Sequence, residues 1–433
     1  MINKIFHLDK FQTNIKIEII SGLTTFMSMA YILLVNPVLL AESGMPLQAA
    51  FTATVWASIL PTLIMSFFAN LPIALAPGMG VNAFFTYTLV HGMGLSWENA
   101  LAAVFISGLL FTIIATFNIP RYIMLSVPKQ LKVAIGAGIG FFITLIGFQN
   151  AGITVKDDTT MIMLGNLANP STLLAIFGLI FTVTLMHKKI KGALLWGILA
   201  ITLVSMLFGL SEPPKSIHNI ISTNIPSISP TFMQLDFGNV LKVSFLSVFF
   251  SMTMVDLFNA MGTFIGLSSK IGENPDGSIR GLKAATIADA TGTLMGSMLG
   301  TSPVTSYLES ITGISEGGKT GLVALTCAVL FLISLVFAPL VELIPTVATA
   351  PCLILVGTFM MQDIKEIDFS EISESLPAFL IIASMPFTYS IVSGFGLGFI
   401  SYCIIQTCTG KIKTVSPVLW LVSICFLINF IVS

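Results

Sequence analysis

The sequence predicts an all-α polytopic membrane protein, and three observations lead to this fold class. Apolar residues make up 55% of the 433-residue chain and charged residues only 9%, whereas soluble domains carry about one-quarter charged residues. The mean hydropathy is +0.96. Apolar runs long enough to cross a bilayer recur along the whole chain and leave no room for a soluble domain.

Each long apolar run is most simply a helix, because a helix satisfies its own backbone groups where there is no water. Seven runs are expected before the middle of the chain, at about 15–38, 49–70, 73–92, 97–117, 131–152, 170–188 and 191–210. Seven more follow, at about 240–268, 281–299, 301–315, 319–342, 346–362, 375–389 and 391–410. The tail, 416–433, is only marginally long enough to cross, so it is either an interfacial or an additional helix. Fourteen spans result.

The two sets of seven spans resemble each other at their third member. Span 3 begins Ala-Pro-Gly-Met-Gly-Val-Asn at Ala76, and span 10 begins Ser-Pro-Val-Thr-Ser-Tyr-Leu-Glu at Ser302. Because seven is odd, the second set must cross the membrane in the opposite sense, which predicts a 7+7 inverted repeat typical of secondary transporters. The expected organisation is a cytoplasmic N-terminal segment, a first repeat, an extracytoplasmic linker, a second repeat and a C-terminal segment, at 1–14, 15–210, 211–239, 240–410 and 411–433.

Basic residues test this topology, because cytoplasmic loops collect Lys and Arg. With the N-terminus in the cytoplasm, sixteen of the nineteen Lys and Arg residues fall inside, and only Lys156, Lys215 and Lys242 fall outside. The pattern favours a multi-pass protein of the cell membrane with a cytoplasmic N-terminus. The formal net charge of -1 offers no global field that would attract nucleic acid.

Spans 3 and 10 differ from the others because they contain residues that propagate helix poorly. Span 3 carries Gly78 and Gly80, and span 10 opens with the hydroxyl-rich run Thr301–Ser306. Interrupted helices survive at membrane depth only where they are buried in protein or line a wet cavity, and their amino ends offer free N–H donors. We therefore expect two half-helices that face each other near the midplane. The alternative is a packing kink in an ordinary bundle.

Ionisable residues inside apolar segments are costly and usually functional. Asp256 lies near the middle of span 8, with Asn259 three residues later on the same helix face, and Glu309 follows the hydroxyl run of span 10. Asn82 is the polar counterpart on span 3. Hydrocarbon disfavours the charged form of a carboxyl, so Asp256 and Glu309 are candidates for coupling proton binding to substrate binding. As alternatives, Asp256 bonds a neighbouring helix, and Asn82 caps its half-helix.

Other positions are weaker candidates. Glu18, at the entry of span 1, and Asp289, within span 9, are expected to serve helix packing or gating. Phe84, Phe85 and Phe258 lie beside the polar positions, where they either stack on a flat ring or fill the core.

Several function classes are disfavoured. No histidine pairs with a carboxylate at a useful spacing, so no metal site is expected. The sequence contains no phosphate-binding loop that would indicate ATP-driven pumping, and no nucleophile and base in a recognisable motif. We therefore expect neither an enzyme nor a cofactor.

Several motifs resemble a known family of transporters. The segments Gly22–Pro37, Ala76–Phe85 and Gly300–Ser310 closely resemble the AzgA-like guanine/hypoxanthine/adenine permeases of the nucleobase/ascorbate transporter superfamily. The likeness covers essentially the whole chain, including Ala134–Gly140 and Met385–Ile391.

The resemblance implies a core domain of spans 1–4 and 8–11, a gate domain of spans 5–7 and 12–14, and proton-driven import of a purine that binds between the half-helices. It places family positions on Asn82, Asp256 and Glu309, and Asp256 and Glu309 stay the candidates for proton coupling because of their depth in the apolar spans. The expected substrate-binding set adds the neighbouring residues Phe84, Phe258, Asn259, Thr305 and Ser306. One departure stands out, because Asn259 replaces an acid of the family and cannot carry a proton.

Other functions remain open at this point. On the same architecture the substrate could be xanthine, uracil or an inorganic anion. An anion carrier would place basic residues near the half-helices, yet none occurs between Lys16 and Arg121. A passive channel or a non-transporting receptor is a further alternative. The preferred purine is not indicated, nor is whether the protein forms a homodimer.

Overall fold

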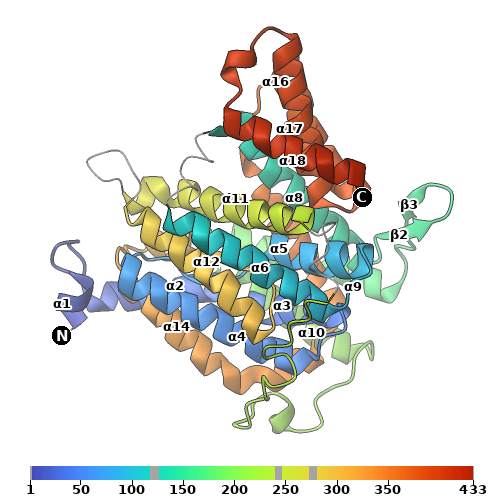
Figure 1. Ribbon diagram of the computed structural model, residues 1–433. Coiled ribbons are helices and arrows are strands. Elements are labelled where there is room, and N and C mark those ends of the chain that lie inside the picture. The colour runs from blue at the N-terminus through green and yellow to red at the C-terminus, as the bar shows by residue number, and fades with distance from the viewer. Residues whose placement is uncertain (1, 118–125, 239–245, 273–279, 433) are drawn as a thin grey trace.

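The computed structural model describes residues 2–117, 126–238, 246–272 and 280–432. Helices make up most of these ranges (Figure 1). The α-helices of the first half are α1 Ile2–Phe6, α2 Ile15–Met29, α3 Ile32–Glu42, α4 Leu47–Ile64, α5 Met79–Ala83, α6 Trp97–Thr116, α8 Lys129–Asn150, α9 Pro170–His187 and α10 Ala193–Leu207. Those of the second half are α11 Leu246–Ile271, α12 Leu282–Leu299, α13 Ser310–Ser315, α14 Gly321–Ser334, α15 Thr346–Met360, α16 Ile372–Thr388, α17 Ile391–Cys408 and α18 Pro417–Val432.

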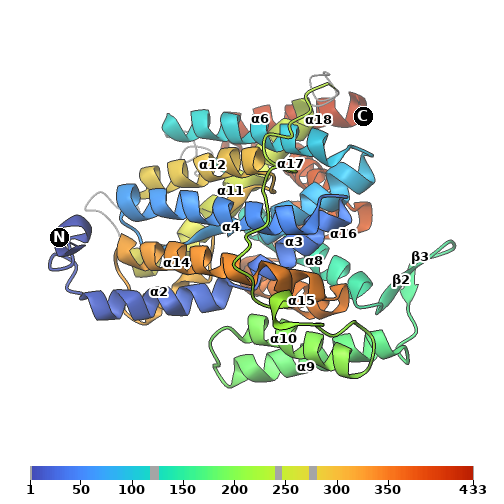
Figure 2. The ribbon, with the colours of Figure 1, turned by 90° about the horizontal axis from the view of Figure 1, so that it is seen from below.

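Short elements complete the chain. Two π-helical segments are η1 Met65–Ala69 and η2 Phe84–Gly92, and the 3-10 segments are η3 Ile217–Asn219, η5 Leu335–Leu343, η6 Gln362–Glu366 and η7 Ile412–Thr414. The strands are β1 Leu75–Pro77, β2 Thr154–Asp157, β3 Met161–Leu164 and β4 Val304–Ser306. Strands β2 and β3 form an antiparallel hairpin that projects from the helices (Figures 1 and 2).

Eight helical segments of the described chain are long and apolar enough to cross a membrane. They are Ile15–Glu42, Leu47–Ala69, Trp97–Thr116, Lys129–Asn150, Pro170–His187, Gly321–Leu343, Thr346–Glu366 and Ile391–Cys408. Three shorter apolar helices lie at Ala193–Leu207, Ile372–Thr388 and Pro417–Ile428. The predicted fold class, an α-helical polytopic membrane protein, is confirmed; the count of fourteen spans stays a prediction.

Polar side chains just outside the apolar runs set where helices begin. Asn14 accepts a hydrogen bond from the backbone of Ile17 at the start of α2, and Ser96 does the same for Asn99 at the start of α6. Asn169 caps α9, whose first residue is a proline. These acceptors satisfy backbone donors that have no partner within the first turn of a helix.

The first predicted span differs from a single regular helix. It begins at Ile15, as expected, but it is divided at Ala30 and Tyr31 into α2 and α3. There, the N–H groups of Leu33 and Leu34 donate to carbonyls only three residues back. This tighter turn separates the two helices, and Tyr31 and Asn36 both belong to the site described below.

Helix packing falls into two groups. The most extensive contacts of α2, α3, α4, α6, α12 and α14 are with one another, and those of α8, α9, α10, α15, α16 and α17 are likewise with one another. The tail forms α18, which packs on α17. After α10, the described part of the irregular segment 208–238 runs across one side of the bundle (Figure 2).

A short two-stranded ribbon lies inside the helical bundle. Strands β1 and β4 pair antiparallel, with Leu75 opposite Ser306 and Pro77 opposite Val304, and all of their residues are buried. The pairing is extended by the N–H of Gly78, which donates to the Pro303 carbonyl. Non-helical backbone of this kind is tolerated at membrane depth only when it is enclosed by protein.

Candidate functional site

The ribbon brings two helix starts to one place. Strand β1 leads through Gly78 into α5, and β4 leads through Tyr307 to Glu309, the residue before α13. Because the strands are antiparallel, α5 and α13 leave the ribbon in opposite directions. Their amino ends, which carry unpaired N–H groups and partial positive charge, therefore lie near its two ends.

Gly78 allows the close packing at this turn. A Cβ atom built on Gly78 would lie 2.6 Å from the Thr305 methyl group, 2.7 Å from a Val81 methyl group and 3.2 Å from Asn259 Nδ2. The half-buried amide of Asn259, on α11, therefore lies directly against the junction of β1 and α5. Any side chain at position 78 would push Asn259 or the ribbon away.

Asn36 of α3 is the centre of a buried hydrogen-bond network. Its Nδ2 donates to Thr54 Oγ1 at 2.8 Å and to Thr301 Oγ1 at 3.0 Å. Its Oδ1 accepts from Asn82 Nδ2 at 3.0 Å and from Ser302 Oγ at 3.2 Å. One side chain thus ties α3 to α4, to α5 and to the segment before β4.

Asn82 keeps one polar atom unpaired. While its Nδ2 donates to Asn36, its Oδ1 is buried and has no partner among the described residues. A buried acceptor without a partner is costly, so such an atom is available to a bound donor.

Asp256 of α11 is fully buried and contacts the ribbon through α12. Its Oδ2 lies 2.6 Å from Thr293 Oγ1, and the same hydroxyl lies 2.9 Å from the Val304 carbonyl of β4. Its Oδ1 has no partner in the described part of the chain.

Asp289 lies one turn before Thr293 on α12 and contacts two side chains of β4. Its Oδ1 accepts from Ser306 Oγ at 3.0 Å, and its Oδ2 lies 3.4 Å from Thr305 Oγ1. Thr305 and Ser306 were both expected to bind substrate. Their hydroxyl groups instead lie near the carboxylate of Asp289, which was one of the weaker candidates in the sequence.

Glu309 is half-buried beside α13. Its Oε1 accepts a hydrogen bond from the Tyr31 hydroxyl at 2.7 Å, and the preceding Leu308 is 44% exposed. Glu309 is thus less buried than Asn82, Asp256 and Asp289, which are all fully buried. Glu309 bonds to Tyr31 and Asp256 bonds to Thr293, so the two carboxyl groups share no described hydrogen-bond partner.

A family model described as the Permease family matches residues 16–397. This protein belongs to that family. Its members are permeases, that is, transporters and not enzymes, so the prediction of a membrane transporter is confirmed.

Named relatives are similar to this permease over their full length. The Guanine/hypoxanthine permease PbuO of Bacillus subtilis is 40% identical over 99% of this chain and 100% of that protein. The Adenine permease AdeP of Escherichia coli is 36% identical over 100% of this chain and 96% of that protein. The resemblance to guanine/hypoxanthine/adenine permeases is therefore confirmed.

A solved structure shares the fold. The transmembrane domain of the cyanobacterial bicarbonate transporter BicA superposes with a TM-score of 0.64 and 17% identity, covering 88% of this permease and 97% of that chain. At this identity the likeness concerns the fold alone.

The aromatic candidates lie in the core of the permease. Phe84 is fully buried, and Phe258 stacks on Phe395 with ring centroids 5.7 Å apart and meets Phe399 edge-on. The described ring contacts of Phe258 thus join α11 to α17. Its stacking on a substrate remains a prediction.

Glu18, a weaker candidate, serves a helix end away from the ribbon. Its carboxylate accepts from the backbone N–H groups of Lys319 and Thr320 and from the Thr320 hydroxyl. Since Thr320 precedes α14, Glu18 adds negative charge where that helix begins, which stabilises the start of α14.

Asn36 is a site residue that the sequence reasoning missed, although it lies in one of the motifs that carry the family resemblance. The available signal was a polar amide between apolar residues of the first span. Asp289 carried the same kind of signal and was considered only for packing or gating.

Proposed function

We propose that this permease is a proton-coupled symporter that imports purine nucleobases such as hypoxanthine, guanine or adenine. The observation that carries the proposal is the buried ribbon of β1 and β4, around which Asn82, Asp256, Asp289 and Glu309 are arranged. The relatives named above as guanine/hypoxanthine and adenine permeases support the substrate class.

The polar groups suit the edge of a purine. Guanine and hypoxanthine present an N–H group next to a carbonyl, and a carboxylate accepts from the first while an amide or backbone N–H donates to the second. In the proposed site, Glu309 anchors the base, while Asn82, Asn259, Thr305 and Ser306 complete the polar lining. Phe84 and Phe258 are the rings available for stacking.

The contacts of Thr293 support Asp256 as the proton carrier. A hydroxyl has one proton to donate, yet Thr293 Oγ1 lies within hydrogen-bond distance of two acceptors, Asp256 Oδ2 and the Val304 carbonyl. Two separate two-centre hydrogen bonds form if Asp256 is protonated and donates to Thr293 while Thr293 donates to Val304. If Asp256 lost that proton, Thr293 would have to give up its hydrogen bond either to Asp256 or to the Val304 carbonyl. The protonation state of Asp256 is thereby linked to the position of β4.

Transport would proceed by alternating access in a fourteen-span inverted repeat. The proposed half-helices are α5 with η2 in span 3 and α13 in span 10. The two packing groups support a core domain, built from spans 1–4 and 8–11, that moves against a gate domain. In this arrangement, the N-terminus is cytoplasmic and the protein resides in the cell membrane.

Competition for uptake tests the substrate class. In cells that lack their own purine permeases, uptake of labelled hypoxanthine should be blocked by unlabelled guanine or adenine and spared by uracil. Block by uracil or xanthine alone would replace the proposal by its alternative, another nucleobase on the same fold. A passive channel is separated by counterflow, since preloaded base drives accumulation only through a carrier.

Replacing Asp256 with asparagine tests the coupling. Asp256→Asn keeps the size of the side chain but cannot exchange a proton, so purine uptake should stop responding to an imposed pH gradient while exchange of base for base persists. Asp289→Asn, in the same assay, is the matched comparison at a second buried acid beside β4. If Asp256→Asn still concentrates purine with the wild-type pH response, another group carries the proton.

A further inference from the structure

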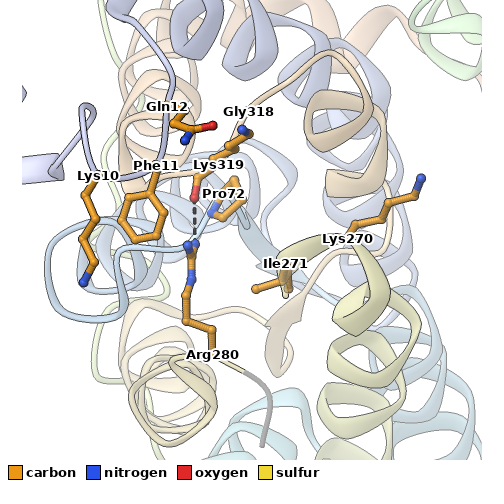
Figure 3. Close-up of a pocket in the computed structure, with 9 residues that line it drawn as sticks. All are labelled: Lys10, Phe11, Gln12, Pro72, Lys270, Ile271, Arg280, Gly318 and Lys319. Carbon is orange, nitrogen blue, oxygen red and sulfur yellow. Dashed lines mark hydrogen bonds between the residues drawn. The ribbon is translucent and has the colours of Figure 1, made fainter. Parts of the chain in front are cut away.

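A pocket of about 280 Å³ lies at the end of the bundle that holds the N-terminal segment. Five segments form it: the loop before α2, Pro72 in the loop before β1, the end of α11, Arg280 just before α12, and the turn before α14. Its lining residues are Lys10, Phe11, Gln12, Pro72, Lys270, Ile271, Arg280, Gly318 and Lys319 (Figure 3). None of them belongs to the ribbon site.

The pocket collects positive charge without described counterions. Four of its nine lining residues are Lys or Arg, and none is acidic. None of the four forms an ion pair with a carboxylate of the described residues, whereas Lys129, Lys191 and Lys411 elsewhere each pair with a glutamate. Bringing like charges together is unfavourable, and a bound anion would offset that repulsion.

Glu18 is an acidic residue behind the same turn, and its oxygens already accept hydrogen bonds. They accept hydrogen bonds from Lys319, Thr320 and Thr13. Among the described lining residues four are cationic and none is acidic, so this lining carries an excess of positive charge.

Arg280 is held in a fixed orientation at the base of the pocket. Its Nη2 donates to the Lys319 carbonyl at 2.7 Å, and its guanidinium carbon lies 4.3 Å from the centroid of the Phe11 ring (Figure 3). The Lys10 ammonium lies 5.8 Å from the centroid of the same ring. A planar guanidinium fixed in this way is suited to the oxygens of a phosphate.

Apolar residues next to the pocket face outward. Phe67 and Phe68 are 50% and 79% exposed, and Asn70, two residues further, contributes a carbonyl 3.4 Å from Arg280 Nη2. Exposed aromatic rings beside a basic pocket are typical of the boundary between the hydrocarbon and the headgroups.

We propose that this pocket binds a phosphate group at the membrane surface, either the headgroup of an anionic phospholipid or a soluble phosphate. Arg280 holds the phosphate oxygens, and Lys10, Lys270 and Lys319 neutralise its charge. The site is independent of the transported substrate and would stand if the permease carried another solute.

Binding of phosphatidylglycerol to the purified full-length permease tests this site. Mixed detergent micelles with increasing phosphatidylglycerol should raise the Tm of the wild type, with phosphatidylcholine as the zwitterionic comparison. The double variant Lys10→Gln/Lys270→Gln, which changes two exposed lysines with no described hydrogen bond, should need about thirtyfold more lipid, from about 1 kcal/mol per basic residue. Lys188→Gln/Lys413→Gln removes the same charge from exposed positions outside the pocket and is the matched control.

Competition identifies the source of the phosphate. Inorganic phosphate that displaces phosphatidylglycerol from the wild type supports a soluble ligand, and failure to displace it supports a lipid headgroup. Equal lipid dependence in the pocket variant and the control variant would overturn the proposal, since binding would then follow total charge alone.

Discussion

Glu309→Gln is expected to abolish accumulation of labelled hypoxanthine. Glutamine keeps the length of the side chain and an oxygen for the Tyr31 hydroxyl, so the fold around α13 should survive. What is lost is a charged acceptor for the N–H edge of the base. Hydrogen bonds to charged groups contribute about 1.5–3 kcal/mol, which corresponds to about a tenfold to 150-fold loss of affinity.

Uptake is measured at a base concentration near the wild-type KM, with the amount of protein in the membrane determined in parallel. The matched control is Glu316→Gln, seven residues further along the chain. Glu316 forms a partly exposed ion pair with Lys191, an interaction that contributes little, so its loss should leave uptake near wild type. Wild-type uptake by Glu309→Gln would remove Glu309 from the proposed site.

The second large effect is expected at Asn36, the centre of the buried network. Asn36→Ala removes the oxygen acceptor of Asn82 Nδ2, which keeps only a 3.8 Å contact to the Met79 sulfur, and the acceptor of the Ser302 hydroxyl, while Thr54 keeps its bond to the Ala50 carbonyl. Unsatisfied buried groups cost about 1–3 kcal/mol each, so we expect a loss of roughly 2–6 kcal/mol in stability. Because Asn82 is also released from its position beside the ribbon, purine uptake should fall with the Tm.

Thermal unfolding of the purified permease and uptake in cells measure the two effects. Asn99→Ala is the control, because Asn99 is also buried but donates to one carbonyl, that of Asp236, outside the site. It should lower the Tm less and leave the apparent affinity for base unchanged. An Asn36→Ala variant with wild-type Tm and uptake would show that the network does not position the site.

Some parts of this picture could be predicted from neighbouring residues in the chain. The membrane class follows from the length of the apolar runs, because hydrocarbon thickness sets a minimum length for any helix that crosses it. The ribbon falls where Pro77, Gly78 and the hydroxyl run at 301–306 interrupt apolar sequence, since these residues form helix poorly. Asp256 was identifiable because an acid in an apolar helix is costly unless it has a partner or a function.

Other parts depended on partners that are far apart in the chain. Asn36 and Ser302 are separated by 266 positions, so no local pattern indicated that they would bond. Asp289 is on α12 and Ser306 is in β4, and only the packing of the strand against the helix shows that their side chains meet. The basic pocket likewise joins Lys10 to Arg280 across most of the chain.

By itself, the sequence determined that this protein is a helical membrane permease with interrupted segments and buried acids, because hydropathy and helix propensity act over a few neighbouring residues. Only the tertiary structure decided which polar groups meet. Hydrogen bonds and charge pairing require atoms to lie within a few ångströms, and only the packing of the helices brings distant segments that close.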